Sequence, residues 1–190
     1  GPMLGGISFD GRKSDGTSPD EAKGMLEAGK ITDAQLDNLI DACNPGCGSC
    51  SFFGTANTMG CLSEALGLSL PGSALIPAVY GERLRSSFMA GRAIVDLVNK
   101  GITARKIITK ESIRNAIKVT MAICGSTNAV LHLSAVANEA ELGMDVVREF
   151  KELNKTTPQI AKVNPAAKWD MEDFYKAGGI PRVMSRLGDI

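Results

Sequence analysis

Three cysteines, Cys43, Cys47 and Cys50, lie within eight positions of one another in a stretch rich in glycine and serine. The residues before Cys43 have the apolar spacing of a helix, and Pro45 with the glycine after it must end that helix. Small residues continue to Asn57, ahead of a long segment with helical apolar spacing. The stretch therefore predicts a thiol-bearing loop beside a helix, which is a common way of presenting a metal or cluster ligand.

Length and charge bound the class of protein. The chain has 190 residues, which fits one domain or one large piece of one. Its 21 Lys and Arg balance its 21 Asp and Glu, so no basic face indicates a nucleic-acid partner. Charge or glycine interrupts each apolar run before the ~18–20 residues that a membrane span needs, and no signal peptide is evident. We expect a soluble, cytoplasmic protein with no nucleic-acid or membrane partner.

Five cysteines form an odd number, and no secretory signal accompanies them, so reduced thiols that bind metal are favoured over disulfides. The spacing resembles half of several iron–sulfur and zinc signatures. A tetrahedral zinc site needs four ligands, however, and Cys61 and Cys124 do not form a second pair. Spacing alone does not say which thiol is a ligand. The alternative is that these cysteines are small packing residues in a glycine-rich turn.

Helix signals dominate the chain. We expect a single partial domain in which 1–17 form a loop, 18–43 a helical pair, 44–57 the cysteine loop and 58–190 a mostly helical core. Helices are predicted over 18–28, 32–43, 51–66, 80–99, 110–124, 129–142, 144–154, 171–177 and 181–187. A short buried strand is predicted over 158–163, and 102–109 suits either a strand or an extended connection.

Several segments carry more specific predictions. The helix over 80–99 should have an inward face and an outward face. We expect the inward residues to be Leu84, Phe88, Ala93/Ile94 and Leu97/Val98, and the outward residues to be Arg83, Arg85, Arg92 and Asp96. The helix over 129–142 is apolar enough to be buried, and His132 within it is interpreted as a core residue rather than a ligand. The polar residues 126–128 either cap this helix or bind an anion through free amides.

Four blocks stand in order along the chain. They are CGSC at 47–50 with GTANTM at 54–59, EALGLSLPG at 64–72, GSTN at 125–128 with VLHL at 130–133, and MED at 171–173 with AGG at 177–179. Together they resemble the dihydroxy-acid dehydratase and 6-phosphogluconate dehydratase family over nearly the whole chain. The opening GPMLGG is similar to a family segment that follows a sheet strand, so we expect the chain to begin in mid-domain.

The resemblance implies a fold class and an activity. The fold is a helix-dominated fragment of the family's N-terminal three-layer α/β domain, with few short strands here and with Leu4 and 158–163 as sheet edges. The activity is that of a hydro-lyase, converting a 2,3-dihydroxy acid to a 2-keto acid in branched-chain amino acid biosynthesis. An iron–sulfur cluster (2Fe-2S or 4Fe-4S) and Mg act as Lewis acids in this family, because hydroxide is a poor leaving group and the C2 proton is weakly acidic.

Only part of that apparatus has a counterpart in this sequence. The family's third cluster cysteine falls on Cys50, and Cys47 and Cys43 are lesser candidates for the cofactor site. The other two family cysteines would lie before residue 1, and the catalytic serine and a magnesium-binding glutamate would lie after residue 190. No catalytic residue is therefore assigned, and we expect the isolated chain to be inactive.

The resemblance leaves the substrate and the assembly open. A sugar-acid (aldonate or 6-phosphogluconate) dehydratase is the alternative within the family, because CNPGC at 43–47 and FF at 52–53 depart from the form common in dihydroxy-acid dehydratases. An alternative of another class is a non-catalytic helical scaffold or a zinc-binding module. Family members are typically dimers, so we expect a small-molecule dihydroxy-acid substrate and a homodimeric full-length enzyme.

Overall fold

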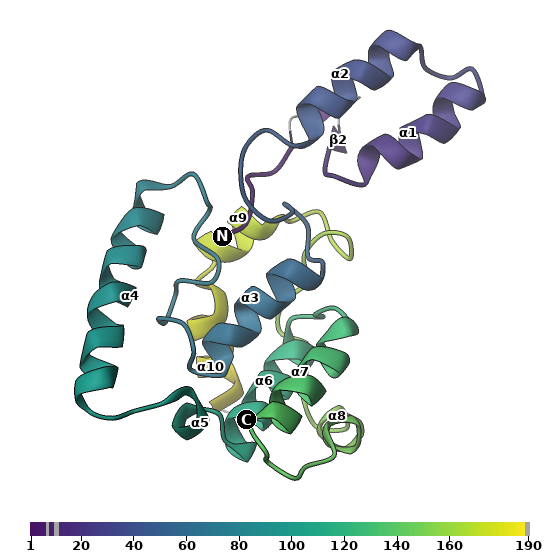
Figure 1. The fold of residues 1–190 in the computed structure, drawn as a ribbon. Helices are drawn as coiled ribbons and strands as arrows, with labels where there is room; N and C mark the ends of the chain where they lie inside the picture. The colour runs from purple at the N-terminus through teal and green to yellow at the C-terminus, as the bar shows by residue number, and fades with distance from the viewer. Residues whose placement is uncertain (7, 10–11, 189–190) are drawn as a thin grey trace.

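The structure is a computed structural model that describes residues 1–6, 8–9 and 12–188 (Figure 1). Helices make up almost all of its regular structure. Its elements are β1 (Ser8–Phe9), β2 (Arg12–Lys13), α1 (Ser18–Glu27), α2 (Asp33–Cys43), α3 (Thr55–Ala65), α4 (Gly81–Asn99), α5 (Ala104–Ile107), α6 (Lys110–Ala122), α7 (Asn128–Glu139), α8 (Val146–Leu153), α9 (Met171–Lys176) and α10 (Gly179–Gly188).

The helices α3 and α6 to α10 form the main part of the structure, here called the body. At its centre, α6 packs against α3, α7, α8 and α10. This helix begins where predicted because Thr109 and Ser112 form a reciprocal capping box that satisfies two free backbone amides. Ile113 and Ile117, one turn apart, are fully buried. Burying a side chain of this size stabilises a fold by about 1.5–3 kcal/mol, so α6 anchors the elements around it.

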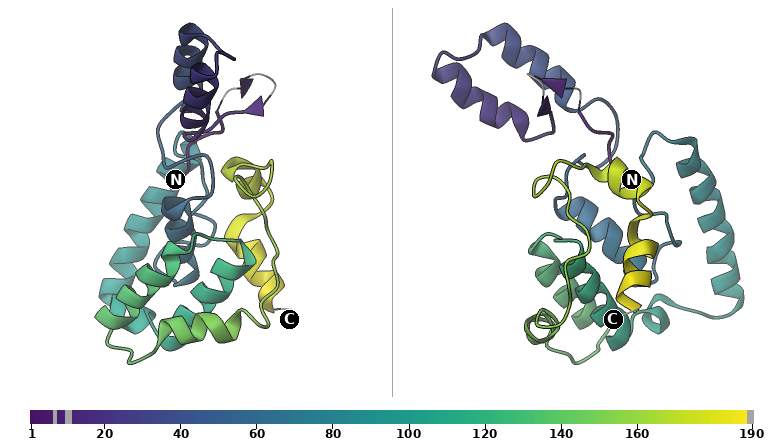
Figure 2. Two further views of the ribbon diagram at one scale, coloured as in Figure 1. Left: turned by 90° about the vertical axis from the view of Figure 1, so that its right-hand side faces the viewer. Right: turned by 180° about the vertical axis from the view of Figure 1, so that it is seen from behind.

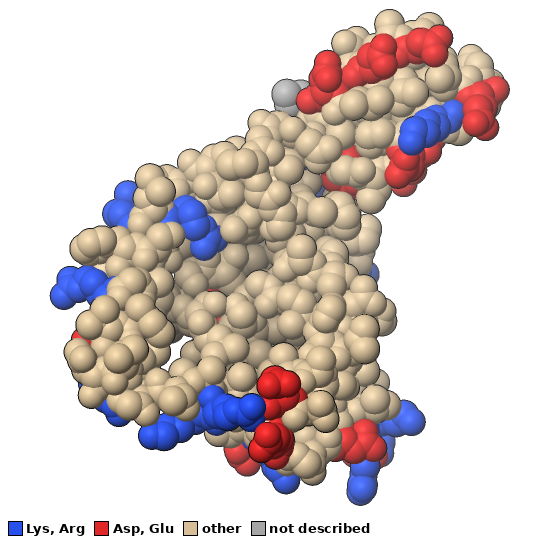
Figure 3. Space-filling model, viewed as in Figure 1, with Lys and Arg blue, Asp and Glu red and all other residues tan. Residues whose placement is uncertain are grey.

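The helices α1 and α2 form an arm that projects from the body in every view (Figures 1 and 2). They pack mainly on each other, and Ala22, Leu39 and Cys43 are buried there. A capping box between Thr32 and Gln35 begins α2 at the predicted position. Acidic side chains gather along the arm in Figure 3. The arm carries Asp20, Glu21, Glu27, Asp33, Asp37 and Asp41.

The helix α4 lies at the opposite margin of the body, and the prediction for its two faces is wrong in part. Ala93 and Leu97 are half-buried beside a groove, as predicted, whereas Arg83, predicted to face outward, lines the same groove and donates to the Ile76 carbonyl. All of its residues are described and none is buried. Leu84, Phe88 and Val98 are 76%, 69% and 71% exposed. Helical spacing reports that one face is apolar, but it does not report whether another element covers that face.

The helix α7 is only partly buried, which corrects the prediction for 129–142. Ala129, Leu133 and Ala137 face the core, whereas Leu131 is 69% exposed and His132 is half-buried. No helix within the described ranges combines the length and the apolar character that crossing a membrane requires.

The predicted strand over 158–163 is also wrong. This segment is extended but is not part of a sheet. The amides of Ile160 and Ala161 both donate to the carbonyl of Ala122, at 2.7 and 2.9 Å, and so satisfy a free acceptor at the end of α6.

Among the described residues, the only sheet is the antiparallel hairpin of β1 and β2, in which Ser8 pairs with Lys13 and Phe9 with Arg12. It lies in the segment predicted to be a loop. Ile7, Asp10 and Gly11 of that segment are outside the described residues. Leu4, predicted as a sheet edge, is not in a strand, although Pro2 forms an isolated parallel bridge with Ser49. The helix-dominated character of the prediction is confirmed.

Candidate functional site

The three clustered thiols point into different surroundings. Cys43 ends α2 and is 1% exposed. Its thiol donates to the carbonyl of Ile40 at 3.2 Å and accepts from the side-chain amide of Asn44 at 3.3 Å. Burial raises the pKa of the Cys43 thiol, which disfavours the thiolate that a metal needs. Cys47 and Cys50 are exposed.

These thiols do not form a complete metal site. Within the part of the chain that the structure describes, no three His, Cys, Asp or Glu side chains are grouped so that they could hold a metal ion. A donor set with one or two accessible thiols suits a shared centre, in which other segments supply the remaining ligands. It does not suit a closed zinc site, which needs four.

The loop that carries Cys50 is held from one side by Asn57, in the first turn of α3. The Asn57 side chain is 4% exposed. Its amide nitrogen donates to the carbonyls of Cys50 and Phe52, the second at 2.8 Å. Its amide oxygen accepts from the Ser49 hydroxyl at 2.6 Å. One buried side chain thus bonds the Cys50 carbonyl and a residue on either side of it, Ser49 through its hydroxyl and Phe52 through its carbonyl.

The N-terminal segment holds the same loop from the other side. The Ser49 amide donates to the Gly1 carbonyl at 3.0 Å, and the Met3 amide donates to the Ser49 carbonyl. Gly48 has φ +130°, and a Cβ added there would come within 2.7 Å of the Met3 nitrogen. Only glycine allows this conformation and this close approach.

Further contacts tie the loop to the C-terminal part of the chain. The Ser51 carbonyl accepts from the amide of Met171, at the start of α9, at 3.1 Å, and the Phe53 amide donates to Asn164 at 2.7 Å. The rings of Phe53 and Phe174 meet edge to face with their centroids 6.4 Å apart. Segments more than 100 residues apart therefore converge on the cysteine loop.

The polar residues 126–128 join two helix starts. The Ser126 amide donates to the Thr58 hydroxyl at 3.0 Å, and the Asn128 side chain donates to the Thr55 hydroxyl at 2.8 Å. The Asn128 amide donates to the Ser126 hydroxyl at 3.2 Å. These side chains thus connect the first turns of α3 and α7, and this connection accounts for the cluster without a ligand.

An ion-paired aspartate stands at the start of α9. Asp170 accepts from the amides of Glu172 and Asp173, at 3.0 and 3.1 Å, and pairs with Lys13 at 2.8 Å. Burial by itself would raise the pKa of Asp170, but the bonds from Lys13 and the backbone amides outweigh it and lower the pKa. Glu172 and Asp173 lie in the first turn of α9, where negatively charged side chains interact favourably with the positive end of the helix dipole.

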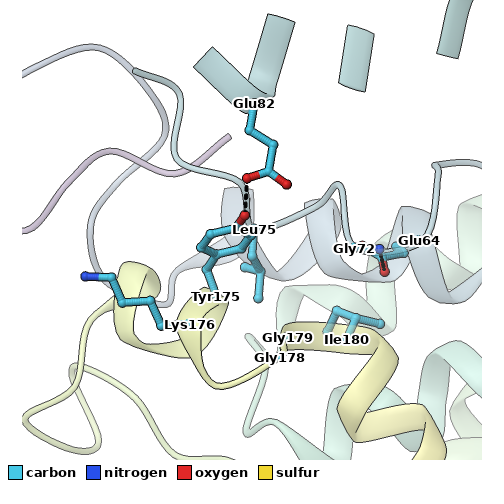
Figure 4. Close-up of a pocket in the computed structure, with 9 residues that line it drawn as sticks. All are labelled: Glu64, Gly72, Leu75, Glu82, Tyr175, Lys176, Gly178, Gly179 and Ile180. Carbon is cyan, nitrogen blue, oxygen red and sulfur yellow. Dashed lines mark hydrogen bonds between the residues drawn. The ribbon is translucent and has the colours of Figure 1, made fainter. Parts of the chain in front are cut away.

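A pocket of about 370 Å³ lies between the α3–α4 connection and the α9–α10 junction (Figure 4). It is lined by Glu64, Gly72, Leu75, Glu82, Tyr175, Lys176, Gly178, Gly179 and Ile180. The Glu64 carboxylate accepts from the amides of Gly72 and Ala74, and the Tyr175 hydroxyl donates to Glu82. The Tyr80 hydroxyl donates to Glu172 in the same way. These acids hold the loop and the start of α4.

Sequence reasoning did not identify Asn57, Gly48 or Asp170 as residues that position the cysteine loop or the helix beside it. Asn57 lies in the GTANTM motif and Gly48 in the CGSC motif, but a sequence motif does not show which backbone groups a side chain contacts. The aspartate directly before the MED block was a usable signal, because aspartate is a preferred N-cap residue.

The fold and the site define a helix-rich chain that holds a hydrogen-bonded loop with two exposed cysteines, Cys47 and Cys50. Comparison with known proteins identifies its relatives. A family profile described as "Dihydroxy-acid/6-phosphogluconate dehydratase N-terminal" matches residues 1–190. The chain therefore belongs to the dihydroxy-acid/6-phosphogluconate dehydratase family, and it resembles the N-terminal part of its members.

Individual relatives agree with the profile. The dihydroxy-acid dehydratase of Halothermothrix orenii is 46% identical over 189 residues, which are 100% of this chain and 34% of that protein. Those of Caldanaerobacter subterraneus subsp. tengcongensis and Thermodesulfovibrio yellowstonii are 48% and 47% identical, over 98% and 100% of this chain and 33% and 34% of theirs. The chain thus spans about a third of the length of these curated relatives.

Proposed function

We propose that the full-length protein is a dihydroxy-acid dehydratase, a hydro-lyase that converts a 2,3-dihydroxy acid to a 2-keto acid in branched-chain amino acid biosynthesis. The observation that carries the proposal is the identity of 46–48% to relatives named dihydroxy-acid dehydratase along essentially the whole chain. The site of catalysis would be completed by polypeptide outside these residues.

Cys50 is the proposed cluster ligand of this segment. Its thiol is exposed, and its backbone is fixed by Asn57 and by the bridge of Ser49 to the N-terminal segment. Such preorganisation is what a ligand needs to meet partners from other segments. Cys47 shares the exposure, whereas the Cys43 thiol is occupied by contacts within its own helix end and is the weakest candidate.

An iron–sulfur cluster, of the 2Fe-2S or 4Fe-4S type, together with Mg would supply electrophiles that stabilise the departing hydroxide and the charge at C2. The contribution of this chain is positional. Asn57 fixes the carbonyl of the ligand residue, and Gly48 permits the close approach of the N-terminal segment. With one proposed ligand, the isolated chain is expected to hold no stable cluster and to be inactive.

The remaining architecture is proposed on the same basis. The segment would belong to a three-layer α/β domain whose sheet is built mostly from polypeptide outside it. The full-length enzyme would be a cytoplasmic homodimer acting on a small-molecule dihydroxy acid.

The substrate assignment has a direct test. The full-length protein, purified without air, would be supplied with 2,3-dihydroxyisovalerate and with a panel of aldonates and 6-phosphogluconate. We expect keto-acid formation from the branched substrate. Absence of that product together with turnover of a sugar acid would assign the protein to the other branch of the family. Zinc bound by the isolated chain in place of iron would favour the zinc-module alternative.

A further inference from the structure

A groove of about 420 Å³ runs between α4 and the loop that follows α3, and Figure 3 shows the surface hollowed beside α4. Residues from the range 67–73 line one wall, and residues from the range 83–97 on one side of α4 line the other. The volume lies within the ~300–1,000 Å³ that small-molecule sites occupy in proteins. Both walls belong to the described chain, so the groove forms without a contribution from another segment.

Arg83 is a half-buried cation at the end of the groove nearest the start of α4. Its Nη2 group donates to the Ile76 carbonyl, and its Nε is buried without an acceptor among the described residues. The ion pairs within the described chain leave Arg83 out. Removing part of a guanidinium from water costs free energy that an anionic partner offsets, so this position favours an anion.

Two of the four serines that line the groove have hydroxyls without a partner in the described part of the chain. Ser73, on the loop wall, is 9% exposed, and Ser86 lies on α4 one turn after Arg83. The other two hydroxyls are occupied, because Ser69 bonds a neighbouring hydroxyl at 2.6 Å and Ser87 donates to the Arg83 carbonyl at 3.0 Å. The groove thus offers two free hydroxyl donors beside its unpaired cation.

The rest of the groove is apolar. On the α4 wall, Ala90, Ala93 and Leu97 follow the polar residues. A helix rises ~1.5 Å per residue, so Leu97 lies about 21 Å along α4 from Arg83. The lining therefore changes along the groove from a cation with hydroxyls to hydrocarbon.

We propose that this groove binds a small aliphatic carboxylate. The carboxylate group lies at Arg83 and accepts from the hydroxyls of Ser73 and Ser86, and the hydrocarbon part lies along Ala93 and Leu97. A carboxylate matches the planar guanidinium and has enough lone pairs to accept from the hydroxyls as well. Such a site is independent of the proposed dehydratase activity.

Equilibrium dialysis of radiolabelled hexanoate against the full-length protein tests the proposal. We expect one bound equivalent per chain that depends on Arg83, with an affinity roughly 10- to 100-fold weaker in Arg83→Met, because charge-assisted hydrogen bonds are lost. Arg92→Met is the matched control, because it removes the same charge from an exposed position of α4 outside the groove, and it should bind as the parent does. Equal affinity in Arg83→Met and the parent would overturn the proposal.

Competitors test the two halves of the ligand. Hexylamine has the hydrocarbon and the opposite charge, so it should not displace hexanoate. Inorganic phosphate has the charge without the hydrocarbon, so it should displace hexanoate only at a concentration at least roughly 10-fold higher than unlabelled hexanoate does. Displacement by either competitor as readily as by hexanoate itself would reject an aliphatic carboxylate.

Two further variants decide if Arg83→Met fails to fold. Ser73→Ala removes one free hydroxyl and should weaken hexanoate binding by roughly 3- to 10-fold. Ala93→Phe fills the apolar part of the groove and should abolish the binding. Parent-like affinity in both variants would reject the groove as the site.

A carboxylate supplied by polypeptide outside residues 1–190 would give a different result. The full-length parent would then bind no Arg83-dependent hexanoate, and Arg83→Met, but not Arg92→Met, would lower the free energy of unfolding. That outcome would overturn the proposal in favour of an internal ion pair. None of these measurements uses catalysis, so they neither support nor weaken the proposed dehydratase activity.

Discussion

Replacing Asn57 by alanine removes the side chain that fixes the proposed ligand loop. Three hydrogen bonds are lost, to the carbonyls of Cys50 and Phe52 and from the Ser49 hydroxyl. The Asn57 side chain is buried, so water does not replace these bonds without rearrangement. At about 0.5–1.5 kcal/mol for each bond, Asn57→Ala should destabilise the protein by about 2–4 kcal/mol.

The same change should affect the cluster beyond its effect on folding. We expect the folded Asn57→Ala protein to bind iron less tightly, because the backbone that carries Cys50 is no longer fixed on the α3 side. Urea unfolding of the full-length protein measures the first effect. The rate at which a chelator removes iron, measured well below the unfolding midpoint, measures the second.

Asn128→Ala is the matched control, because its side chain makes one exposed hydrogen bond, to Thr55, and none to the residues around Cys50. Asn128→Ala should lower the free energy of unfolding by less than about 1 kcal/mol and leave the rate of iron release unchanged. If Asn57→Ala behaves like this control in both measurements, the positioning role of Asn57 is refuted.

Three further predictions follow from the contacts of the site. Gly48→Ala should lower the free energy of unfolding by more than about 1 kcal/mol, because φ +130° disfavours a side chain and the added Cβ would meet the Met3 nitrogen. Urea unfolding measures this loss, and Gly143→Ala, at an open glycine with φ +57°, should lower the free energy of unfolding by less. Asp170 has a lowered pKa, so its contribution to stability is present above its unfolded pKa and is lost as pH falls through its folded pKa; Lys13→Met should flatten that acid-side loss in urea titrations from pH 7 to pH 2. Iodoacetamide should alkylate Cys50 in the cluster-free native chain far faster than Cys43, and equal rates by mass mapping would contradict the burial that separates them.

Local signals in the sequence predicted where most helices begin, because capping depends on residues three positions apart. Thr32 with Gln35 and Thr109 with Ser112 show this. Which helix faces are buried was harder to predict from the sequence. The helix α4 itself was correctly predicted, but most of its predicted inward residues are exposed, because helical spacing does not describe which other elements cover a face.

The candidate site shows the same division. Spacing placed three thiols in one loop, yet the C-terminal end of α2 turns Cys43 inward while Cys50 stays exposed. Asn57 can hold the loop only because the backbone of Cys50 returns to the start of α3. Residues 160–161 can cap α6 only because their amides reach the carbonyl of Ala122 at its end. Such contacts are set by tertiary structure and cannot be predicted from local sequence. For this reason 158–163 was predicted as a strand, although it is an extended segment that caps a helix.

Cys50 is the ligand that we propose this segment supplies to the cluster of a dehydratase. The most direct test of this role is the iron and acid-labile sulfide content, per chain, of the full-length protein and of Cys50→Ser and Cys43→Ser, all purified without air. We predict a cluster in the parent and in Cys43→Ser and its loss in folded Cys50→Ser. A full cluster in Cys50→Ser would show that Cys50 is not a cluster ligand.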